Sequence, residues 1–291
     1  MTESGRVVVI GDALVDEMRD EAGSVNAPGG SALNVAVGLA ILGVPSTLIA
    51  MVGDDADGDY LRAYLSRFDV ELLASASALG TGRAVSDRSA GEPRYTFNAA
   101  ALARSIVYTM EMRQAISRAP LVAVSSYPLD VAAEASALTD ALDGRPGVLI
   151  DPNPRDGFLA DRDAFTRALD QLVESSHLIK IGDEDARLLY DLGVDEVAAR
   201  FASNGAGVVL ATAGAEGATV LAAGRSIRAP ITADARAVVD TMGAGDATFA
   251  SVIAHLIATG EAPVDWTMVL DRSMAIAAET IRHAGGQLRR P

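Results

Sequence analysis

Short runs of β-branched and other apolar residues recur along the chain, and stretches with helical spacing lie between them. The runs predict strands at 6–12, 46–53, 121–126, 147–154, 177–185 and 207–214. Amphipathic spacing predicts helices at 31–43, 59–68, 112–120, 163–175 and 195–204. Near-continuous apolar strands that alternate with helices are typical of a parallel sheet covered on both faces. We therefore expect an α/β fold with three layers, α/β/α, and a mainly parallel central sheet.

Two polar stretches, 11–30 and 80–100, interrupt this alternation and lack helical periodicity. The second is typical of a hairpin, in which 83–87 and 94–98 alternate with period two around a turn at 89–93. We expect both stretches to form a small β-sheet lid, at about 12–28 and 80–100, inserted into a single domain that spans 1–291. No internal repeat or flexible linker divides the sequence.

Composition narrows the possible functions. Of 291 residues, 49% are hydrophobic, which is enough for a sizeable core, and the formal net charge is −15. An acidic surface argues against a nucleic-acid partner, although backbone amides can still bind a small phosphate ligand. The chain has no cysteine, so thiol catalysis and disulfides are excluded, and its three histidines are widely separated. No apolar stretch predicts a signal peptide or a membrane span, so we expect a cytoplasmic protein without a membrane partner.

The segment 238–256 combines three small residues, an aspartate and an apolar helix. A helix N-terminus carries unpaired amides and a partial positive charge, and small residues let a ligand approach that backbone closely. We expect an anion cradle at Gly243, Ala244 and Gly245, with Asp246 beside it in the first turn. A carboxylate next to a phosphate site repels the ligand unless it accepts a proton from the attacking group. The combination therefore favours phosphoryl transfer to a hydroxyl.

A simpler interpretation of this segment is that Asp246 only interacts with the helix dipole and that the glycines only form a turn. The segment is not a Walker A loop, because G-x-x-x-x-G-K-[ST] does not occur in the chain. No dinucleotide-binding G-x-G-x-x-G follows the first strand either. The rest of the sequence decides between the two interpretations.

Motifs along nearly the whole chain resemble those of the ribokinase/PfkB family of carbohydrate kinases. The motifs occur in the family's order: VIGDALVDEM, GGSALNVA, RYTFN, DPNPR, KIGDEDARLL, ATAGAEGATVL, DTMGAGDATFASV and HAGGQ. DPNPR is similar to the segment of fructokinase-like members. The resemblance implies a ribokinase-like fold with a β-sheet lid, and an ATP-dependent sugar kinase.

The resemblance also implies roles for single residues. Asp246 would be the general base that deprotonates the sugar hydroxyl, and the turn 243–245 would be the anion hole for the γ-phosphoryl group. The sugar would be bound by Asp16, Gly29, Gly30, Asn34 and, from the lid, Arg94. The nucleotide would be bound by Lys180, Thr212, Gly214 and Gly217. A carboxylate such as Asp16 can accept two hydrogen bonds from neighbouring hydroxyls, which suits a polyol. Lys180, Arg94 and the weaker lid candidate Arg83 could equally be surface charges.

Two segments depart from the family pattern. At the positions of the family's Asn-x-x-Glu, which organises Mg2+ through water, this chain has Gly182 and Asp185. We therefore expect ATP and water to supply most of the ligands of Mg2+, with Asp185 contributing through water. The second Thr of DTTGAGD is Met242, close to Asp240, which the resemblance associates with a monovalent-cation site. We therefore expect ATP and Mg2+ as cofactors, with K+ as a further candidate.

The substrate is less constrained than the reaction. DPNPR and a lid built on RYTF favour a fructokinase-like hexose kinase, while ribose, 2-keto-3-deoxygluconate and a nucleoside stay open. A nucleoside would need aromatic stacking, for which Tyr95 and Phe97 are the candidates, and a keto acid would need cations, for which Arg94 is the candidate. A catalytically silent sugar-binding regulator and a nicotinamide oxidoreductase are the alternatives from other classes. The alternating strand at 94–98 would suit a homodimer formed through the lid.

Overall fold

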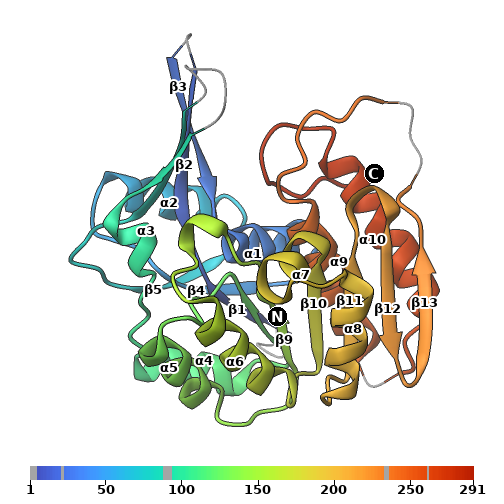
Figure 1. Ribbon diagram of the computed structural model, residues 1–291. Coiled ribbons are helices and arrows are strands. Elements are labelled where there is room, and N and C mark those ends of the chain that lie inside the picture. Colours follow the sequence, from blue (N-terminus) through green and yellow to red (C-terminus); the bar gives the residue numbers. More distant parts are fainter. Residues whose placement is uncertain (1–4, 21–22, 88–93, 233–235, 261) are drawn as a thin grey trace.

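The computed structural model describes residues 5–20, 23–87, 94–232, 236–260 and 262–291. Its centre is a nine-stranded sheet with the order β13-β12-β11-β10-β9-β8-β1-β4-β5 (Figure 1). Adjacent parallel strands form most of it: β1 (Val7–Gly11), β4 (Ser46–Met51), β5 (Glu71–Ser75), β8 (Val122–Ser125), β9 (Val148–Asp151), β10 (Leu178–Gly182) and β11 (Val208–Thr212). Two strands at one end of the sheet pair antiparallel with their neighbours: β12 (Ala218–Ala222) with β11, and β13 (Arg225–Ala229) with β12. The expected mainly parallel sheet is confirmed.

Helices cover both faces of this sheet and complete the three layers. One face is covered by α1 (Ser31–Ile41), α2 (Ala56–Ser66), α9 (Ala244–Thr259) and α10 (Trp266–Thr280). The other is covered by α4 (Met110–Arg118), α5 (Ala132–Leu142), α6 (Arg162–Val173), α7 (Asp183–Tyr190) and α8 (Val194–Ser203). The two faces follow from strand alternation: in β1, Val7 and Val9 enter the first core, while Val8 and Ile10 enter the second. No helix in the described ranges is long and apolar enough to cross a bilayer.

The elements expected from the sequence are present, but the expected strands run past the observed ends, by three residues at 147–154, where β9 ends at Asp151, and at 177–185. The expected strands correspond to β1, β4, β8, β9, β10 and β11, and the expected helices to α1, α2, α4, α6 and α8. The strand expected at 177–185 is too long, because β10 ends at Gly182 and α7 begins at Asp183. Asp185 explains this boundary: its carboxylate accepts a hydrogen bond from the Gly182 N–H at 2.9 Å and caps α7.

A second sheet of four strands rises from the body of the molecule (Figure 1). Its order is β3-β2-β6-β7, formed by β2 (Leu14–Asp20), β3 (Gly23–Gly29), β6 (Gly82–Asp87) and β7 (Arg94–Phe97). β6 and β7 pair antiparallel, which confirms the expected hairpin, while its expected turn at 89–93 lies outside the described residues. The ring of Phe97 packs on that of Phe158, with centroids 4.2 Å apart, and joins the second sheet to the 3-10 helix η1 (Asp156–Phe158). α3 (Ala99–Ala103), which was not expected, follows β7 directly.

Arg83 in β6 forms hydrogen bonds that connect the second sheet to the main body. Its guanidinium donates to Glu17 Oε2 at 2.7 Å and to the two carboxylate oxygens of Asp57 at 2.5 and 2.9 Å. Because Asp57 belongs to α2, these bonds tie the second sheet to the main body. The weaker expectation that Arg83 closes over a substrate is therefore corrected.

The strand order places a switch point beside β1. From β1 the chain adds β4 and β5 on one side, and then returns to add β8 to β11 on the other. In open α/β sheets, ligands bind outside the carboxyl ends of the strands at such a point. The strands that meet here end at Gly11, Ser125 and Asp151, and these ends border the candidate site.

Candidate active site

Asp246 lies at the head of α9 with only 5% of its surface exposed. Ser31 Oγ donates to its Oδ1 at 2.6 Å, and Asn34 Nδ2 donates to its Oδ2 at 2.9 Å. The hydroxyls of Ser31 and Ser125 are 2.6 Å apart, so a second hydroxyl at the end of β8 orients the first. Each carboxylate oxygen has two lone pairs, and these bonds use one on each oxygen. Asp246 is therefore fixed in direction and still able to accept a proton.

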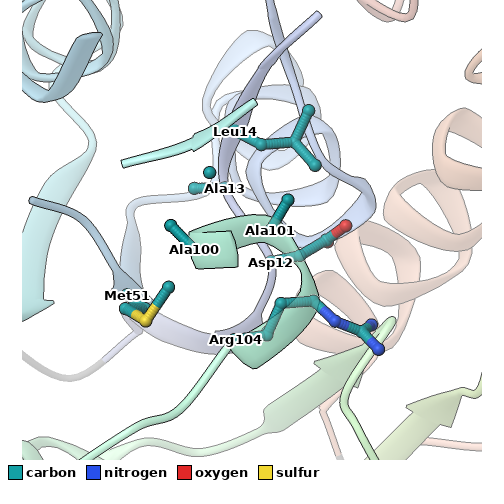
Figure 2. Close-up of a pocket in the computed structure, with 9 residues that line it drawn as sticks. Asp12, Ala13, Leu14, Met51, Ala100, Ala101 and Arg104 are labelled. Atoms are coloured by element: carbon teal, nitrogen blue, oxygen red, sulfur yellow. The ribbon is translucent and has the colours of Figure 1, made fainter. Parts of the chain in front are cut away.

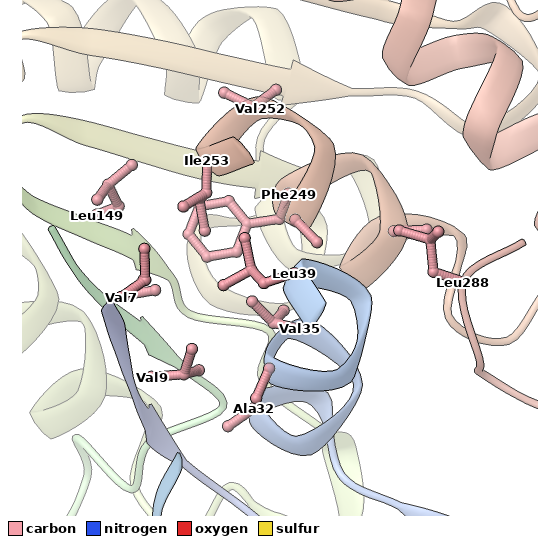
Figure 3. Close-up of a cluster of buried hydrophobic side chains, with 14 of the residues drawn as sticks. Val7, Val9, Ala32, Val35, Leu39, Leu149, Phe249, Val252, Ile253 and Leu288 are labelled. Carbon is pink, nitrogen blue, oxygen red and sulfur yellow. The ribbon is translucent and has the colours of Figure 1, made fainter. Parts of the chain in front are cut away.

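Close packing of α1 on α9 brings these groups together. Figure 3 shows side chains from β1, α1 and α9, among them Val9, Val35 and Phe249, meeting in one apolar cluster. Gly38 permits the approach, since a Cβ at this position would lie 3.0 Å from the Cβ of Ala250. Interiors packed at this density transmit small shifts, so the hydrogen bonds to Asp246 depend on this helix contact.

The turn before α9 has the backbone expected of an anion cradle. Gly243 is the N-cap with a φ of 77°, and a Cβ there would lie 2.3 Å from the carbonyl oxygen of Gly286. The bond that opens the helix runs from the Ala247 N–H to the Gly243 carbonyl at 2.8 Å. The N–H groups of Gly245 and Asp246 precede it and have no acceptor within the helix. They offer donors to an anion at the positive end of α9.

Lys180 lies beside this turn and is not a surface charge, because it is only 4% exposed. Its Nζ is 3.0 Å from both carboxylate oxygens of Asp151, which is fully buried at the end of β9. A Cβ on Gly245 would be 3.3 Å from the same Nζ. Burial raises the pKa of Asp151 to about 6, although Lys180 acts to lower it. Burial would lower the pKa of Lys180, but Asp151 and then Asp185 raise it overall, so the pair is charged at neutral pH.

Asp16 and two glycines form another part of the site, at the base of β2 and β3. The Asp16 carboxylate lies against Gly29, where a Cβ would come within 1.9 Å of Oδ2. Gly30 has a φ of 104°, and a Cβ there would lie 2.7 Å from the carbonyl oxygen of Asp12. Both positions require glycine so that the backbone can approach these acids. The side chain of Arg94 lies outside the described part of the structure, so its role stays a prediction.

Arg104 was not expected from the sequence, yet it borders the same region. It ends α3 in the left-handed conformation, with a φ of 42°, and its guanidinium stacks 4.5 Å from the ring centroid of Phe158. Figure 2 shows this guanidinium and the carboxylate of Asp12 extending in the same direction from the walls of a small cavity at the end of β1. Nε of Arg104 is buried without a hydrogen-bond partner among the described residues.

Two arginines act electrostatically on the two acids of this region. Burial raises the pKa of Asp12, and burial followed by repulsion from Asp12 raises the pKa of Asp16 to about 6. Arg104 and Arg155 oppose the shift at Asp12, and Arg155 opposes it at Asp16. Asp246 also repels Asp12, and Asp130 also acts on Arg104, so the described acids at this end of the site are not outnumbered by the two arginines.

Thr212, Gly214 and Gly217 lie where β11 ends, next to the end of β10. Thr212 is the register partner of Gly182, and the 3-10 helix η2 (Gly214–Glu216) turns the chain back into β12. Gly217 has a φ of 93°, and a Cβ there would lie 2.1 Å from the carbonyl oxygen of Ala229. The expected turn is present, and its contact with a nucleotide stays a prediction.

Asp185 and Asp240, the residues expected near cations, both bind backbone amides. Oδ2 of Asp185 accepts the Gly182 N–H, which leaves Oδ1 for a water-mediated contact. Asp240 accepts the N–H groups of Met242 and Gly285, both at 3.0 Å, and joins the segment before α9 to the C-terminal loop. Within the described ranges, no cluster of three acidic or histidine side chains is suited to a metal. These residues fit a Mg2+ held mainly by nucleotide phosphates and water.

The structure brings Asp246, the cradle, Asn34 and Lys180 into one region, but it gives Asn34 an unexpected partner. The sequence suggested a contact from Asn34 to the sugar, whereas its amide donates to Asp246. The expected aromatic Phe97 packs on Phe158. Sequence reasoning missed several polar residues that border the site: Asp12, Ser31, Arg104, Ser125, Asp151 and Arg155. Ser125 and Asp151 could have been found, because each is the polar last residue of an apolar strand.

Comparisons with known proteins agree with this arrangement. The model of the pfkB family carbohydrate kinases matches residues 5–291. A fructokinase from Klebsiella pneumoniae is 32% identical over 271 residues, which are 88% of this chain and 86% of the relative. The structure of a Xylella fastidiosa fructokinase with bound ATP matches with a TM-score of 0.84 at 19% identity, covering 97% of this chain and 94% of that one. A Vibrio cholerae fructokinase double mutant, solved with fructose, ADP and a potassium ion, matches with a TM-score of 0.79 at 22% identity and covers 97% and 94% of the two chains.

The family match spans nearly the whole chain, and the fold agrees with it. The protein is therefore a sugar kinase, a phosphotransferase with an alcohol group as acceptor, and it belongs to the pfkB family of carbohydrate kinases.

Proposed function

We propose that this kinase transfers the γ-phosphoryl group of MgATP to a hydroxyl of fructose, with Asp246 as the general base. The observation that carries the proposal is the position of Asp246: a buried carboxylate, held by Ser31 and Asn34, next to unpaired amides at a helix N-terminus. A carboxylate beside an anion cradle is useful when it removes a proton from the nucleophile. The fructokinase relatives support a hexose as the acceptor.

The proposed reaction uses each part of the site once. The sugar hydroxyl gives its proton to Asp246 as its oxygen attacks the γ-phosphorus, and the bond from that phosphorus to the β–γ bridging oxygen breaks to release ADP. Amides of the turn 243–245 and the first turn of α9 stabilise the charge on the transferring oxygens. Thr212, Gly214 and Gly217 hold the nucleotide. Mg2+, bound with ATP, would neutralise phosphate charge, supported through water by Asp185.

The charge balance of the sugar end supports a neutral substrate. Asp12 and Asp16 can accept hydrogen bonds from hydroxyls, and Gly29 and Gly30 leave backbone space beside them. Arg104 and Arg155 are already opposed by these acids. A phosphorylated or acidic sugar would add an anion to a region where the described side chains hold no excess of positive charge.

A coupled ADP-release assay with MgATP tests the proposal against fructose, ribose, 2-keto-3-deoxygluconate, adenosine, fructose 6-phosphate and no acceptor. We expect the highest kcat/KM with fructose, and values at least about 100-fold lower for the two anionic sugars. A kcat/KM for either anionic sugar that is higher than that for fructose would contradict the inference that the pocket binds a neutral sugar. ATP binding without turnover of any acceptor, in folded protein, would instead favour a sugar-binding regulator.

Sugar binding should weaken in acid because of Asp16. Its carboxylate can accept hydrogen bonds from the sugar at both oxygens only when it is ionised, because protonation turns one oxygen into a donor. Burial raises the pKa of Asp16 to about 6, so the ionised fraction falls as the pH drops through 6. We expect the dissociation constant for fructose, measured by calorimetry without nucleotide, to rise about tenfold from pH 7 to pH 5. Asp16→Asn should bind fructose more weakly at pH 7 and lose this pH dependence. A variant with the same pH dependence as the wild type would show that Asp16 does not bind the sugar.

Three further assignments belong to the proposal. A K+ site beside Asp240 is supported by the potassium ion in the Vibrio cholerae relative, and kcat measured with K+ replaced by tetramethylammonium tests it. A homodimer through the second sheet is supported by the exposure of Val25 in β3, at 63%, and Val25→Asp should convert a dimer to a monomer in light scattering. A cytoplasmic location is tested by cell fractionation.

A further inference from the structure

Arg104 belongs to a short helix whose position is fixed by hydrogen bonds. The Asn98 side chain caps α3 by accepting the Ala101 N–H at 2.8 Å, and its amide donates to the Thr81 carbonyl at 2.8 Å. The N–H of Arg104 closes the last turn of α3 by donating to the Ala100 carbonyl at 3.1 Å. The backbone that carries the arginine is therefore held in place beside the end of β1.

The guanidinium of Arg104 is oriented by two contacts but is not fully bonded. It lies 4.5 Å from the centroid of the Phe158 ring, and Nη1 donates to the Ser126 carbonyl at 3.2 Å. Nε is buried and has no partner among the described residues. A buried N–H without a partner costs free energy, so native proteins normally provide such a donor with a ligand or a water. Arg104 thus holds a donor in a fixed position for a molecule that binds beside it.

The cavity next to Arg104 places one acceptor and one donor on otherwise apolar walls. Asp12 and Arg104 are the charged residues that line it, and they extend in the same direction in Figure 2. The rest of the lining comes from the ends of β1 and β4, the base of the second sheet and α3, and it consists of apolar residues and glycines. A ligand in this cavity meets an ionised carboxylate, which only accepts hydrogen bonds, and a guanidinium, which only donates them.

A cyclic sugar needs both kinds of group. Its hydroxyls can donate to Asp12 and Asp16, but its ring oxygen carries no hydrogen and can only accept. The amide of Asn34 already donates to the general base, and Arg155 is exposed and lines the neighbouring cavity. In this part of the described structure, Arg104 is therefore the side-chain donor best placed for a ring oxygen.

We propose that Arg104 donates a hydrogen bond from Nε to the ring oxygen of the acceptor sugar, and that it thereby selects a sugar in its cyclic form. Arg104 is then a specificity-determining residue, and no proton passes through it. The residue lies outside every sequence motif that carries the family resemblance, between RYTFN and DPNPR. The inference rests on the proposed function, since it adds a residue to the same sugar site.

The contact can be tested by removing either of its two atoms. Calorimetry without nucleotide gives the dissociation constants of fructose and of its carbocyclic analogue, in which a methylene group replaces the ring oxygen. We expect wild-type protein to bind the analogue about 30-fold more weakly than fructose, and Arg104→Met to bind fructose about 30-fold more weakly than wild type does. Arg104→Met should bind the two ligands within about threefold of each other, because the donor is already absent. An equal loss on the analogue in both proteins would overturn the inference.

Kinetics separate this contact from a general effect on the fold. Arg104→Met should raise KM for fructose about 30-fold, while kcat and the affinity for the ATP analogue AMP-PNP stay within about threefold. Arg113→Met is the matched control, because Arg113 also lies over a ring, 5.8 Å from the centroid of Tyr108, and donates to a backbone carbonyl, that of Asp140. It is exposed on α4, and its substitution should leave both KM and the dissociation constant of fructose unchanged.

Asp130 tests a water as the alternative partner of Nε. Its Oδ1 is also buried without a partner in the described ranges, and Asp130 and Arg104 both line the neighbouring cavity. If a water in that cavity joined Oδ1 to Nε, Arg104→Met and Asp130→Asn would lower the unfolding midpoint to a similar extent and leave the affinity for fructose unchanged, which would overturn the inference. We expect Asp130→Asn to keep its affinity for fructose within about twofold, and Arg104→Met to lose it.

Failure of the proposed function would have a different signature. If ribose rather than fructose is phosphorylated, Arg104→Met should weaken the binding of ribose about 30-fold, so that only the choice of sugar fails. If no sugar is phosphorylated but fructose binding still depends on Arg104, the proposed reaction fails while the contact stands. Phosphorylation of fructose with the same kcat/KM in wild type and in Arg104→Met would overturn the contact alone.

Discussion

Asp246→Asn is expected to lower kcat at least about 10³-fold while leaving ATP binding largely unchanged. The substitution keeps the shape of the side chain and removes the proton acceptor. The site can accommodate the new amide group, because Ser31 and Ser125 are hydroxyls that can exchange donor and acceptor roles. Steady-state kinetics with fructose, together with calorimetric titration of AMP-PNP, measure the two effects.

A control at the head of another helix tests the simpler role for Asp246. Asp265 caps α10 and accepts the N–H groups of Thr267 and Met268. If Asp246 only complemented the helix dipole, Asp246→Asn and Asp265→Asn would both cost about 0.3–1 kcal/mol of stability and leave kcat intact. We expect Asp265→Asn to behave in that way. Retention of most activity in Asp246→Asn would contradict its assignment as the base.

Gly243→Ala should lower kcat about 100-fold or more by disturbing the anion cradle. The residue has a φ of 77°, and the new Cβ would lie 2.3 Å from the carbonyl oxygen of Gly286, a backbone atom that cannot rotate away. The C-terminal loop or the turn must move, and the amides of Gly245 and Asp246 then no longer point at the phosphoryl group. Single-turnover kinetics report the effect on phosphoryl transfer itself.

Gly260→Ala is the matched control for this effect. Gly260 ends the same helix with a φ of 58°, but in the described part of the chain no atom beyond its neighbours and the backbone of its own helix lies within 4 Å of its Cβ position. Both variants introduce backbone strain of about 1–3 kcal/mol, whereas only Gly243→Ala displaces the neighbouring loop. Equal kcat in the two variants, with equal losses of stability, would contradict the role of the turn 243–245.

The layers of the fold could be predicted because they depend on local periodicity. The apolar run at 6–12 contains β1, whose alternate residues enter the two cores, and the spacing at 31–43 contains α1. The small residues before Asp246 also carry a local signal, since a helix start and a need for close approach are visible in sequence. The boundary at Gly182 was missed because it depends on a side-chain cap from Asp185.

The partners of the site residues could not be predicted, because they arise from elements far apart in the chain. Ser31 and Asp246 are separated by 215 positions, and only the packing of α1 on α9 brings them within 2.6 Å. The sequence left open whether Lys180 binds the nucleotide or is a surface charge at a strand end, and its buried contact with Asp151, at 3.0 Å, appears only when β9 and β10 pair. Arg104 carries no motif, and its place beside Asp12 follows from the left-handed end of α3.

Phosphorus NMR of a reaction mixture tests the central claim most directly. With MgATP and fructose, we expect the γ-phosphate signal of ATP to fall while a phosphomonoester signal and the signals of ADP rise by the same amount, with little inorganic phosphate. This result would establish transfer to a sugar hydroxyl. Inorganic phosphate as the only new product, or no change although ATP and fructose both bind, would contradict the account.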